Sequence, residues 1–154
     1  MKILNWSWRN YKSYGDVKQT MSFAPDKGEL ILLIGENGAG KSSLIETLDL
    51  SVYGEVQNKQ GKRLSQKNFP NRNNGKLEVE VTFQTDETCT IKRNMQNLSS
   101  PLKTELIIDG VPYGKANKID DKILEKIGFD YKTYKSFISM NVNNFKNFIS
   151  LTPE

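Results

Sequence analysis

Residues 35–42, with the sequence Gly-Glu-Asn-Gly-Ala-Gly-Lys-Ser, constrain the fold of this chain more than any other stretch. They fit the spacing G-x-x-x-x-G-K-[ST], in which a glycine-rich turn follows a buried strand and opens a helix. The apolar run at residues 29–34 predicts that strand, and apolar residues at helical spacing predict a helix from Lys41 to about Tyr53. We therefore expect a phosphate-binding loop within an α/β fold.

The residue types in this loop suit a phosphate ligand. Gly35, Gly38 and Gly40 let the backbone turn successive N–H groups inward around phosphate oxygens, and the following helix adds its positive N-terminal end. Lys41 would supply a positive charge to the β- and γ-phosphates, which makes it the expected catalytic residue. The Ser42 hydroxyl would complete an oxygen shell around Mg²⁺. The predicted cofactors are ATP and Mg²⁺.

Composition narrows the functional classes. The 154 residues suffice for one domain with a real core, and a net charge of +4 permits contact with nucleic acid without requiring it. The chain contains no histidine, which excludes histidine-based catalysis within it. Its single cysteine, Cys89, excludes an intrachain disulfide and is expected to be buried in a strand. No apolar run approaches the length of a membrane span, so we expect a cytoplasmic protein without a membrane partner.

Alternation of apolar and polar residues predicts an antiparallel β-rich portion beside the loop. The expected strands cover residues 2–8, 17–23, 77–85, 88–95, 104–108 and 111–113. Asp109 follows an apolar run, as a Mg²⁺ ligand of nucleotide hydrolases does, but Asp-Gly between two strands is a hairpin signal, so we reject it as a metal ligand.

Three helices are expected, at residues 41–53, 119–127 and 131–140, the first ending at Gly54. The expected inner face of the first helix is formed by Leu44, Ile45, Leu48 and Val52. In the last helix, the aromatic Tyr134 and Phe137 are expected in the core rather than in a surface that stacks on bases.

Residues 55–76 differ in character from the rest. No acidic residue occurs between Glu55 and Glu78. The cations of this basic segment are Lys59, Lys62, Arg63, Lys67, Arg72 and Lys76. Such a loop is either a surface that contacts phosphates or a solvated surface without a ligand, and the sequence favours neither.

Three segments in order along the chain carry a resemblance to a known family. They are residues 9–14 (Arg-Asn-Tyr-Lys-Ser-Tyr), residues 35–46 and residues 129–134 (Phe-Asp-Tyr-Lys-Thr-Tyr). Together they closely resemble the N-terminal ATPase half of the SMC-like DNA double-strand-break repair ATPases, which include the bacterial SbcC subunit and a phage recombination-endonuclease ATPase subunit. The resemblance implies a P-loop NTPase fold of the ABC-type ATPase head. Residues 1–154 would be its N-terminal half, truncated before a coiled coil, and Thr-Pro-Glu at the C-terminus resembles a helix start.

The resemblance also implies an activity and partners. ATP would be sandwiched between two heads of a homodimer and hydrolysed, with coupling to double-stranded DNA and to an Mre-type nuclease subunit. The C-terminal half of the head would bring the signature motif, the Mg²⁺-binding Asp with its catalytic Glu, and the switch histidine, none of which occurs in this chain. The residues that match the family's nucleotide site are Lys12, Ser13, Asn37, Gly38, Ala39, Gly40, Lys41, Ser42 and Ser43.

One position departs from the family pattern. Relatives carry a glutamine that reaches Mg²⁺ and senses the γ-phosphate, and the alignment places Val142 there. Valine cannot ligate a cation, so Asn141, Asn143 or a water molecule would have to make that contact. A non-hydrolysing nucleotide-binding or DNA-binding module is therefore an alternative to the ATPase. An ABC transporter-type ATPase and a small P-loop kinase are further alternatives, which the segment at residues 9–14 and the sheet-rich residues 77–113 respectively disfavour.

Overall fold

Six strands form one sheet in the order β2-β1-β3-β4-β5-β6, and every neighbouring pair is antiparallel. The computed structural model describes residues 1–24, 28, 30–58, 60–73 and 75–139. The strands are β1 (Lys2–Arg9), β2 (Gln19–Ser22), β3 (Leu77–Gln84), β4 (Thr88–Met95), β5 (Lys103–Ile108) and β6 (Val111–Pro112). The predicted strands are thus confirmed, with β2 shorter than expected.

Alternation of side chains gives the sheet one apolar and one polar face. Val81 pairs with Ile91 and Phe83 with Cys89, and all four side chains are buried on the same face. The hairpin between β5 and β6 turns at Asp109 and Gly110, whose φ angles are 47° and 80°. The Asp109 carboxylate accepts a hydrogen bond from the N–H of Thr88 at 2.8 Å, so Asp109 is a turn residue, as predicted.

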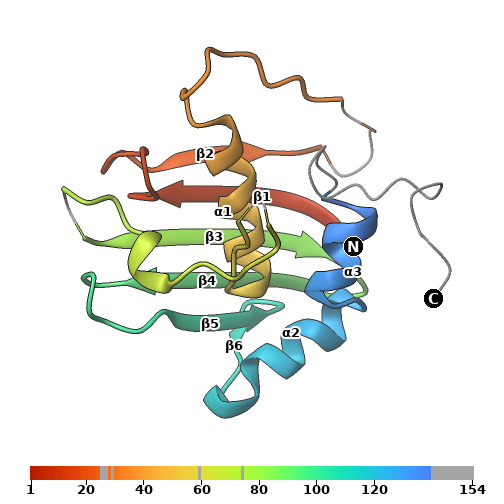
Figure 1. Cartoon of the computed structure of the whole chain (residues 1–154). Helices are drawn as coiled ribbons and strands as arrows, with labels where there is room; N and C mark the ends of the chain where they lie inside the picture. Colours follow the sequence, from red (N-terminus) through yellow and green to blue (C-terminus); the bar gives the residue numbers. More distant parts are fainter. Residues whose placement is uncertain (25–27, 29, 59, 74, 140–154) are drawn as a thin grey trace, which may run out of the picture.

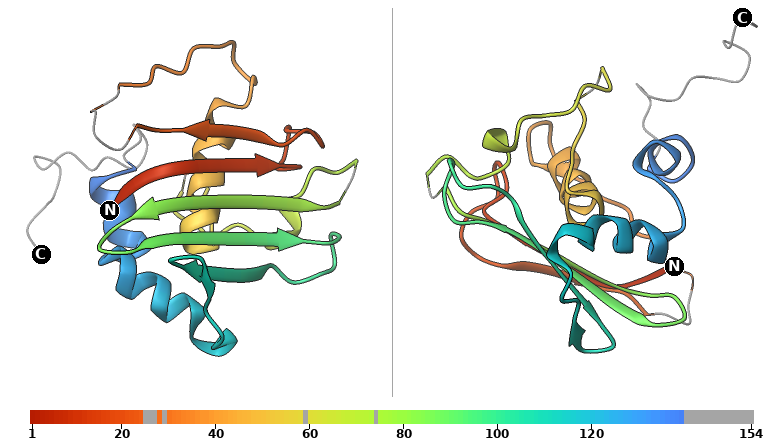
Figure 2. Two further views of the ribbon diagram at one scale, coloured as in Figure 1. Left: turned by 180° about the vertical axis from the view of Figure 1, so that it is seen from behind. Right: turned by 90° about the horizontal axis from the view of Figure 1, so that it is seen from below.

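All helices in the described part of the chain lie on the apolar face of the sheet (Figures 1 and 2). They are α1 (Lys41–Tyr53), α2 (Ile119–Ile127) and α3 (Tyr131–Phe137), with the short 3₁₀ helices η1 (Gln66–Asn68) and η2 (Ala116–Lys118). Leu50 of α1 packs in one buried cluster with Trp6 and Trp8 of β1, and Ile123 of α2 packs in a second with Phe83. The sheet and these helices therefore share a two-part core, which sets the position of α1.

Helix α1 has the predicted bounds. It begins after Gly40, with φ of 93°, and ends at Gly54, with φ of 69° and an N–H that donates to the Leu50 carbonyl at 2.9 Å. The predicted inner face is wrong at Ile45, which is 39% exposed. The polar residues Thr47, Asp49 and Ser51 are buried instead. The helix is covered on several sides, because the basic segment and α3 pack on it as well as the sheet.

The predicted strand before the phosphate loop is wrong. Residues 30–34 have no strand structure, and Leu30 and Ile34 are 99% and 85% exposed. In Figure 1 this segment, coloured orange, runs beyond β2 at the edge of the sheet. A buried strand needs hydrogen-bonded neighbours, and none of the described strands pairs with these residues.

Helix α3 ends earlier than expected, at Phe137. Its Tyr134 is buried as predicted, but Phe137 is 75% exposed, which corrects its expected place in the core. Only one face of α3 packs inward, where the rings of Tyr131 and Tyr134 each lie 5.1 Å from the ring of Tyr53. Val142 with its asparagine neighbours, and the predicted helix start near the C-terminus, lie outside the described residues.

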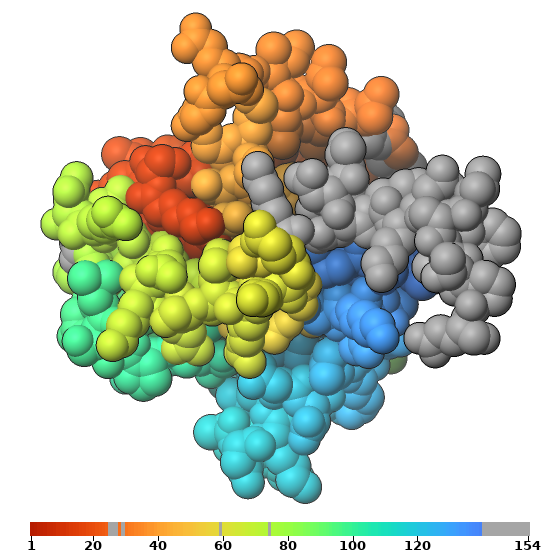
Figure 3. Space-filling model, in the orientation of Figure 1, coloured from red at the N-terminus to blue at the C-terminus, as the bar shows by residue number. Residues whose placement is uncertain are grey.

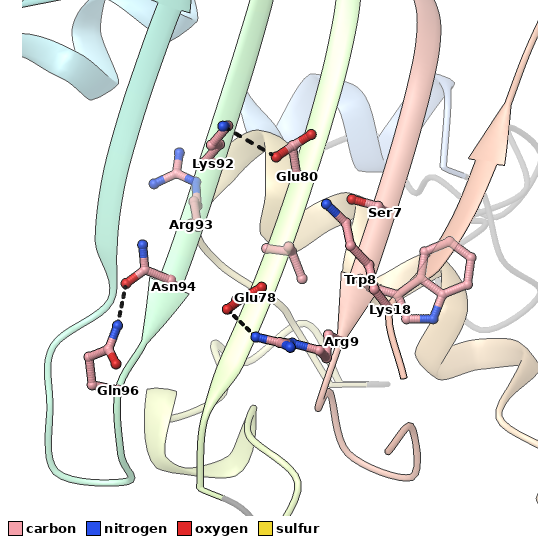
Figure 4. Close-up of a pocket in the computed structure, with 11 residues that line it drawn as sticks. Ser7, Trp8, Arg9, Lys18, Glu78, Glu80, Lys92, Arg93, Asn94 and Gln96 are labelled. Atoms are coloured by element: carbon pink, nitrogen blue, oxygen red, sulfur yellow. Dashed lines mark hydrogen bonds and ion pairs between the residues drawn. The ribbon is translucent and has the colours of Figure 1, made fainter. Parts of the chain in front are cut away.

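The polar face of the sheet bears a hollow of about 260 Å³ over β1, β3 and β4 (Figure 4). Cations and carboxylates alternate across it, with Arg9 paired to Glu78 and Lys92 paired to Glu80. This face therefore offers no concentrated charge of one sign. None of the helices in the described part of the chain has both the length and the apolar character needed to cross a bilayer.

Candidate phosphate-binding site

The phosphate loop and the turn after β1 enclose an open pocket of about 380 Å³. Its lining residues are Lys12, Ser13, Asn37, Gly38, Gly40, Lys41, Ser42 and Ser43. The pocket thus brings together every residue of the predicted nucleotide site except Ala39, whose N–H donates to the Glu36 carbonyl at 3.2 Å within the loop. Residues more than twenty positions apart in the sequence meet here, and no carboxylate is among the lining residues.

Gly40 is required here for two reasons. Its φ of 93° is strained for any residue with a side chain. A Cβ atom at this position would also lie 3.2 Å from the Ser13 hydroxyl oxygen and 3.4 Å from that of Tyr14. The Tyr14 hydroxyl donates to the Gly40 carbonyl at 3.2 Å, so the turn after β1 packs directly on the loop. Burial raises the pKa of this tyrosine, which keeps it a hydrogen-bond donor.

Lys41 is held over the start of the loop. Its ammonium group donates to the carbonyls of Gly35 and Glu36 at 2.6 and 2.7 Å. The ammonium therefore lies beside the glycine-rich turn, where a bound phosphate would exchange neutral carbonyl partners for charged oxygens.

The site fits Mg²⁺ that arrives with a nucleotide rather than a metal held by the protein alone. Ser42 contributes a hydroxyl to the pocket lining. Within the described residues, no group of three or more His, Cys, Asp or Glu side chains is arranged to hold a metal ion. Most ligands of a bound Mg²⁺ would therefore be phosphate oxygens and water, which this small ion accepts readily.

Lys12 joins this pocket from the turn after β1. Its ammonium group is paired with the carboxylate of Glu46, which also accepts a hydrogen bond from the hydroxyl of Tyr11 at 2.9 Å. Tyr11 is fully buried, and its burial together with the charge of Glu46 raises its pKa. Sequence reasoning did not identify Glu46 as the partner of Lys12 and Tyr11, because Glu46 lies more than thirty residues after both.

The basic segment lies against the same turn and forms a second pocket of about 470 Å³. Its lining residues are Lys12, Leu64, Lys67, Asn68, Pro70, Asn71, Arg72 and Asn73. In Figure 3 this segment, yellow to yellow-green, spreads beside the red turn after β1 and below the orange phosphate loop. Val56 and Phe69 anchor it in the core with fully buried side chains.

The opposite end of α1 is fixed by an arginine that the sequence analysis passed over. Arg93 of β4 is 3% exposed and donates to the carbonyls of Ser51 and Val52 at 3.2 and 3.1 Å, and to Thr104 and Asp120. Burial lowers its pKa, against the opposing effect of Asp120. A cation at an inward position of a strand, between Ile91 and Met95, is the signal that could have identified it.

The chain matches a known protein family and is similar in sequence to several ATPases. A family model described as AAA domain matches residues 7–153. The chain is 25% identical to the probable DNA double-strand break repair Rad50 ATPase of Aquifex aeolicus over 138 residues, covering 88% of this chain and 14% of that protein. It is 24% identical to the Rad50 ATPase of Methanococcus maripaludis, covering 99% and 14%, and 30% identical to the methionine import ATP-binding protein MetN of Bacillus subtilis, covering 84% and 39%. The chain thus spans about one seventh of the Rad50 relatives.

Solved structures show the same fold. One, from work on ATP-driven dimerization and DNA-stimulated activation of SMC ATPases, superposes with a TM-score of 0.69 at 20% identity, covering 99% of this chain and 93% of that one. An SMC head bound to the C-terminal winged-helix domain of ScpA gives a TM-score of 0.56 at 17% identity, covering 83% and 40%. The fold is that of a P-loop ATPase head, mixed α/β with an antiparallel sheet. With a family model that matches nearly its whole length, the chain belongs to the AAA domain family.

Proposed function

We propose that this chain is the N-terminal, phosphate-binding half of the ATPase head of an SMC-like DNA break-repair ATPase of the SbcC type or its phage counterpart. The observation that carries the proposal is the pocket in which Lys12 and Ser13 meet residues of the loop between Asn37 and Ser43. Its size, its lysines and its lack of lining carboxylates suit the triphosphate of ATP with Mg²⁺. Likeness to the Rad50 ATPases supports the assignment to DNA repair.

The exposed apolar run at residues 30–34 supports the idea that another segment of the head packs against this chain. Five consecutive apolar side chains that precede the phosphate loop lie exposed, with Leu30 and Leu32 at 99% and 78%. A strand supplied by the C-terminal half of the head would bury them and satisfy their backbone groups. In this proposal that half also brings the groups that activate water, and a second head closes over the nucleotide.

A first experiment tests nucleotide binding by this chain. Isothermal titration of Mg²⁺·ATP into the chain is expected to give saturable binding that Lys41→Ala removes, because the ammonium group contributes charge at the β- and γ-phosphates. Lys103→Ala is the matched control, since Lys103 is an exposed lysine of β5. Equal binding by the wild type and Lys41→Ala would contradict the proposed site.

A second experiment tests hydrolysis and its coupling to DNA. The complete head, assembled from this chain and its C-terminal half, is expected to hydrolyse ATP faster with double-stranded DNA, and Lys41→Ala should abolish that activity. Tight ATP binding without hydrolysis would instead favour the non-hydrolysing nucleotide-binding module. The same assay with a purified Mre-type nuclease would test coupling to break processing in the bacterial or phage-infected cytoplasm.

The cations of the basic segment support the proposal that this segment contacts the DNA backbone. Lys67 and Arg72 line a pocket that holds no carboxylate among its lining residues. If both contact phosphates, Lys67→Ala with Arg72→Ala should weaken DNA binding uniformly across sequences and lower the salt slope of log K by about 2. Lys103→Ala again serves as the control. An unchanged slope would assign the segment to a solvated surface.

A transporter-type ATPase is the second candidate, favoured by the 30% identity to the MetN import protein. In that case the head would associate with a membrane-embedded partner, and DNA would not change its ATPase rate. The DNA-dependent assay above therefore separates the two candidates.

A further inference from the structure

The turn after β1, residues 10–15, carries two of the residues that line the phosphate-loop pocket. These residues are Lys12 and Ser13. The backbone of the turn is uncommon, because Asn10 and Lys12 have φ angles of 55° and 48°, in the left-handed region that residues with side chains rarely adopt. A conformation of this kind persists only where the surrounding structure holds it. The contacts of the turn therefore determine whether Lys12 and Ser13 stay in place.

The basic segment supplies backbone contacts to this turn. The N–H of Lys12 donates to the Phe69 carbonyl at 2.9 Å, and the N–H of Asn71 donates to the Asn10 carbonyl at 2.7 Å. An isolated antiparallel bridge lies between these two hydrogen bonds. The turn and the basic segment thus lie side by side like two short strands, although they are far apart in the sequence.

The Asn71 side chain completes this junction. Its amide nitrogen donates to the Lys12 carbonyl at 2.7 Å and to the Tyr14 carbonyl at 3.2 Å. Its amide oxygen accepts a hydrogen bond from the N–H of Asn73 at 2.9 Å, which is consistent with only one orientation of the amide. This arrangement needs two donors and an acceptor on one short side chain. Asparagine has both, whereas an ionised aspartate of the same shape has no donor.

The same turn packs directly on the phosphate loop and on α1. The Tyr14 hydroxyl donates to the Gly40 carbonyl at 3.2 Å, and the Lys12 ammonium pairs with the carboxylate of Glu46. Asn71 itself is not among the residues that line the pocket at the phosphate loop. Any effect of Asn71 on a ligand in that pocket must therefore pass through the turn.

We propose that Asn71 is a positioning residue of the nucleotide site, which holds the turn after β1 in the shape that presents Lys12 and Ser13 to the phosphates. This inference rests on the proposed function, because it takes Mg²⁺·ATP to be the ligand. Without the Asn71 donors, only a fraction of the molecules would have the turn in this shape, and the apparent affinity would fall by that fraction. Conversely, a bound nucleotide would stabilise the junction between the turn and the basic segment.

Asn71→Asp tests the role of the two donated hydrogen bonds. The variant keeps the shape of the side chain but replaces the amide by a carboxylate. Isothermal titration of the full chain should give an affinity for Mg²⁺·ATP about tenfold below that of the wild type. Asn71→Ala, which removes the donors without adding a charge, should weaken binding to a similar extent. Asn73→Asp is the matched control, because it places the same charge in the pocket of the basic segment and leaves the Asn71 donors intact. It should change the affinity less than about twofold.

Hydrogen exchange measures the same coupling from the other direction, and in the wild type it depends on no variant. Saturating Mg²⁺·ATP should slow exchange of the Asn71 backbone N–H about threefold, although this N–H bonds to the Asn10 carbonyl rather than to the ligand. In Asn71→Asp the N–H should exchange faster than in the wild type, and saturating nucleotide should restore its protection. A residue that only stabilised the fold would lower the urea midpoint and leave the affinity of the folded chain unchanged.

Three results would overturn this inference while leaving the proposed function intact. They are unchanged affinity in Asn71→Asp and Asn71→Ala, equal weakening in Asn71→Asp and the Asn73→Asp control, and an Asn71 exchange rate that does not respond to nucleotide in a wild type that binds it. No binding of Mg²⁺·ATP by the wild type would refute the proposed function, and this inference with it.

Discussion

Replacing Arg93 by methionine tests how the phosphate-loop helix is anchored. The change removes a cation that is 3% exposed and donates to the last-turn carbonyls of Ser51 and Val52. Each buried carbonyl left without a donor costs about 1–3 kcal/mol, and methionine restores part of the packing. Loss of the ion pair with Asp120 adds little to this cost, because the Asp120 side chain is 73% exposed and water replaces the arginine. We expect the free energy of unfolding to fall by about 3 kcal/mol.

Urea unfolding of the chain measures this loss. Trp6 and Trp8 are almost completely buried in the core, so their fluorescence reports unfolding directly. The midpoint should fall while the urea dependence of the free energy stays constant. Lys92→Met is the matched control: its ammonium lies on the polar face, 3.7 Å from Glu80, and its loss should cost no more than about 0.5 kcal/mol. A loss below about 1 kcal/mol in Arg93→Met would refute the anchoring role.

Three further outcomes are expected. Gly40→Ala should weaken Mg²⁺·ATP binding about tenfold in a calorimetric titration with helix content unchanged by circular dichroism, because a left-handed alanine costs about 1–2 kcal/mol; wild-type affinity would contradict the strained loop. The backbone N–H of Thr133 lowers the pKa of the N-cap residue Asp130, so its stabilisation is complete above the ordinary aspartate pKa and is lost as pH falls through the lowered folded-state value. The Tm difference between wild type and Asp130→Ala should therefore shrink on acidification, and a constant difference would argue against the charged cap. Cys89 is fully buried and burial raises its pKa, so iodoacetamide should modify it in urea but not in the folded chain; rapid labelling without urea would indicate local opening.

Local patterns were enough to predict most of the sheet and the start of α1. Strand alternation depends on neighbouring residues, so β3 and β4 were found within a residue of their observed ends. Asp109 and Gly110 specify their turn by backbone preference alone. The glycine-rich loop likewise carries its own geometry, so Gly40, Lys41 and Ser42 of the motif line the pocket as expected.

The predictions that were wrong concern the burial of side chains, which depends on residues distant in the sequence. Residues 30–34 have the composition of a buried strand, but composition does not supply the neighbouring strands, and Leu30 is 99% exposed. Phe137 is exposed although Tyr134, three residues earlier, is buried, because only one face of α3 meets Tyr53. Local patterns also could not predict that Glu46 pairs with Lys12 and Tyr11, since these contacts depend on the turn after β1 packing against α1.

Contacts hold the phosphate loop on one side but not on the other, and this affects how it would bind a phosphate. From one side the Tyr14 hydroxyl holds the Gly40 carbonyl, and at the far end of α1 Arg93 holds the last turn, while the residues before Gly35 pair with none of the described strands. Lys41 meanwhile donates to the Gly35 and Glu36 carbonyls. Those hydrogen bonds are to neutral acceptors, and phosphate oxygens make charge-assisted ones about twice as strong. If the proposed nucleotide binds, the Lys41 ammonium would exchange these two carbonyls for phosphate oxygens, and the carbonyls of Gly35 and Glu36 would lose their donor.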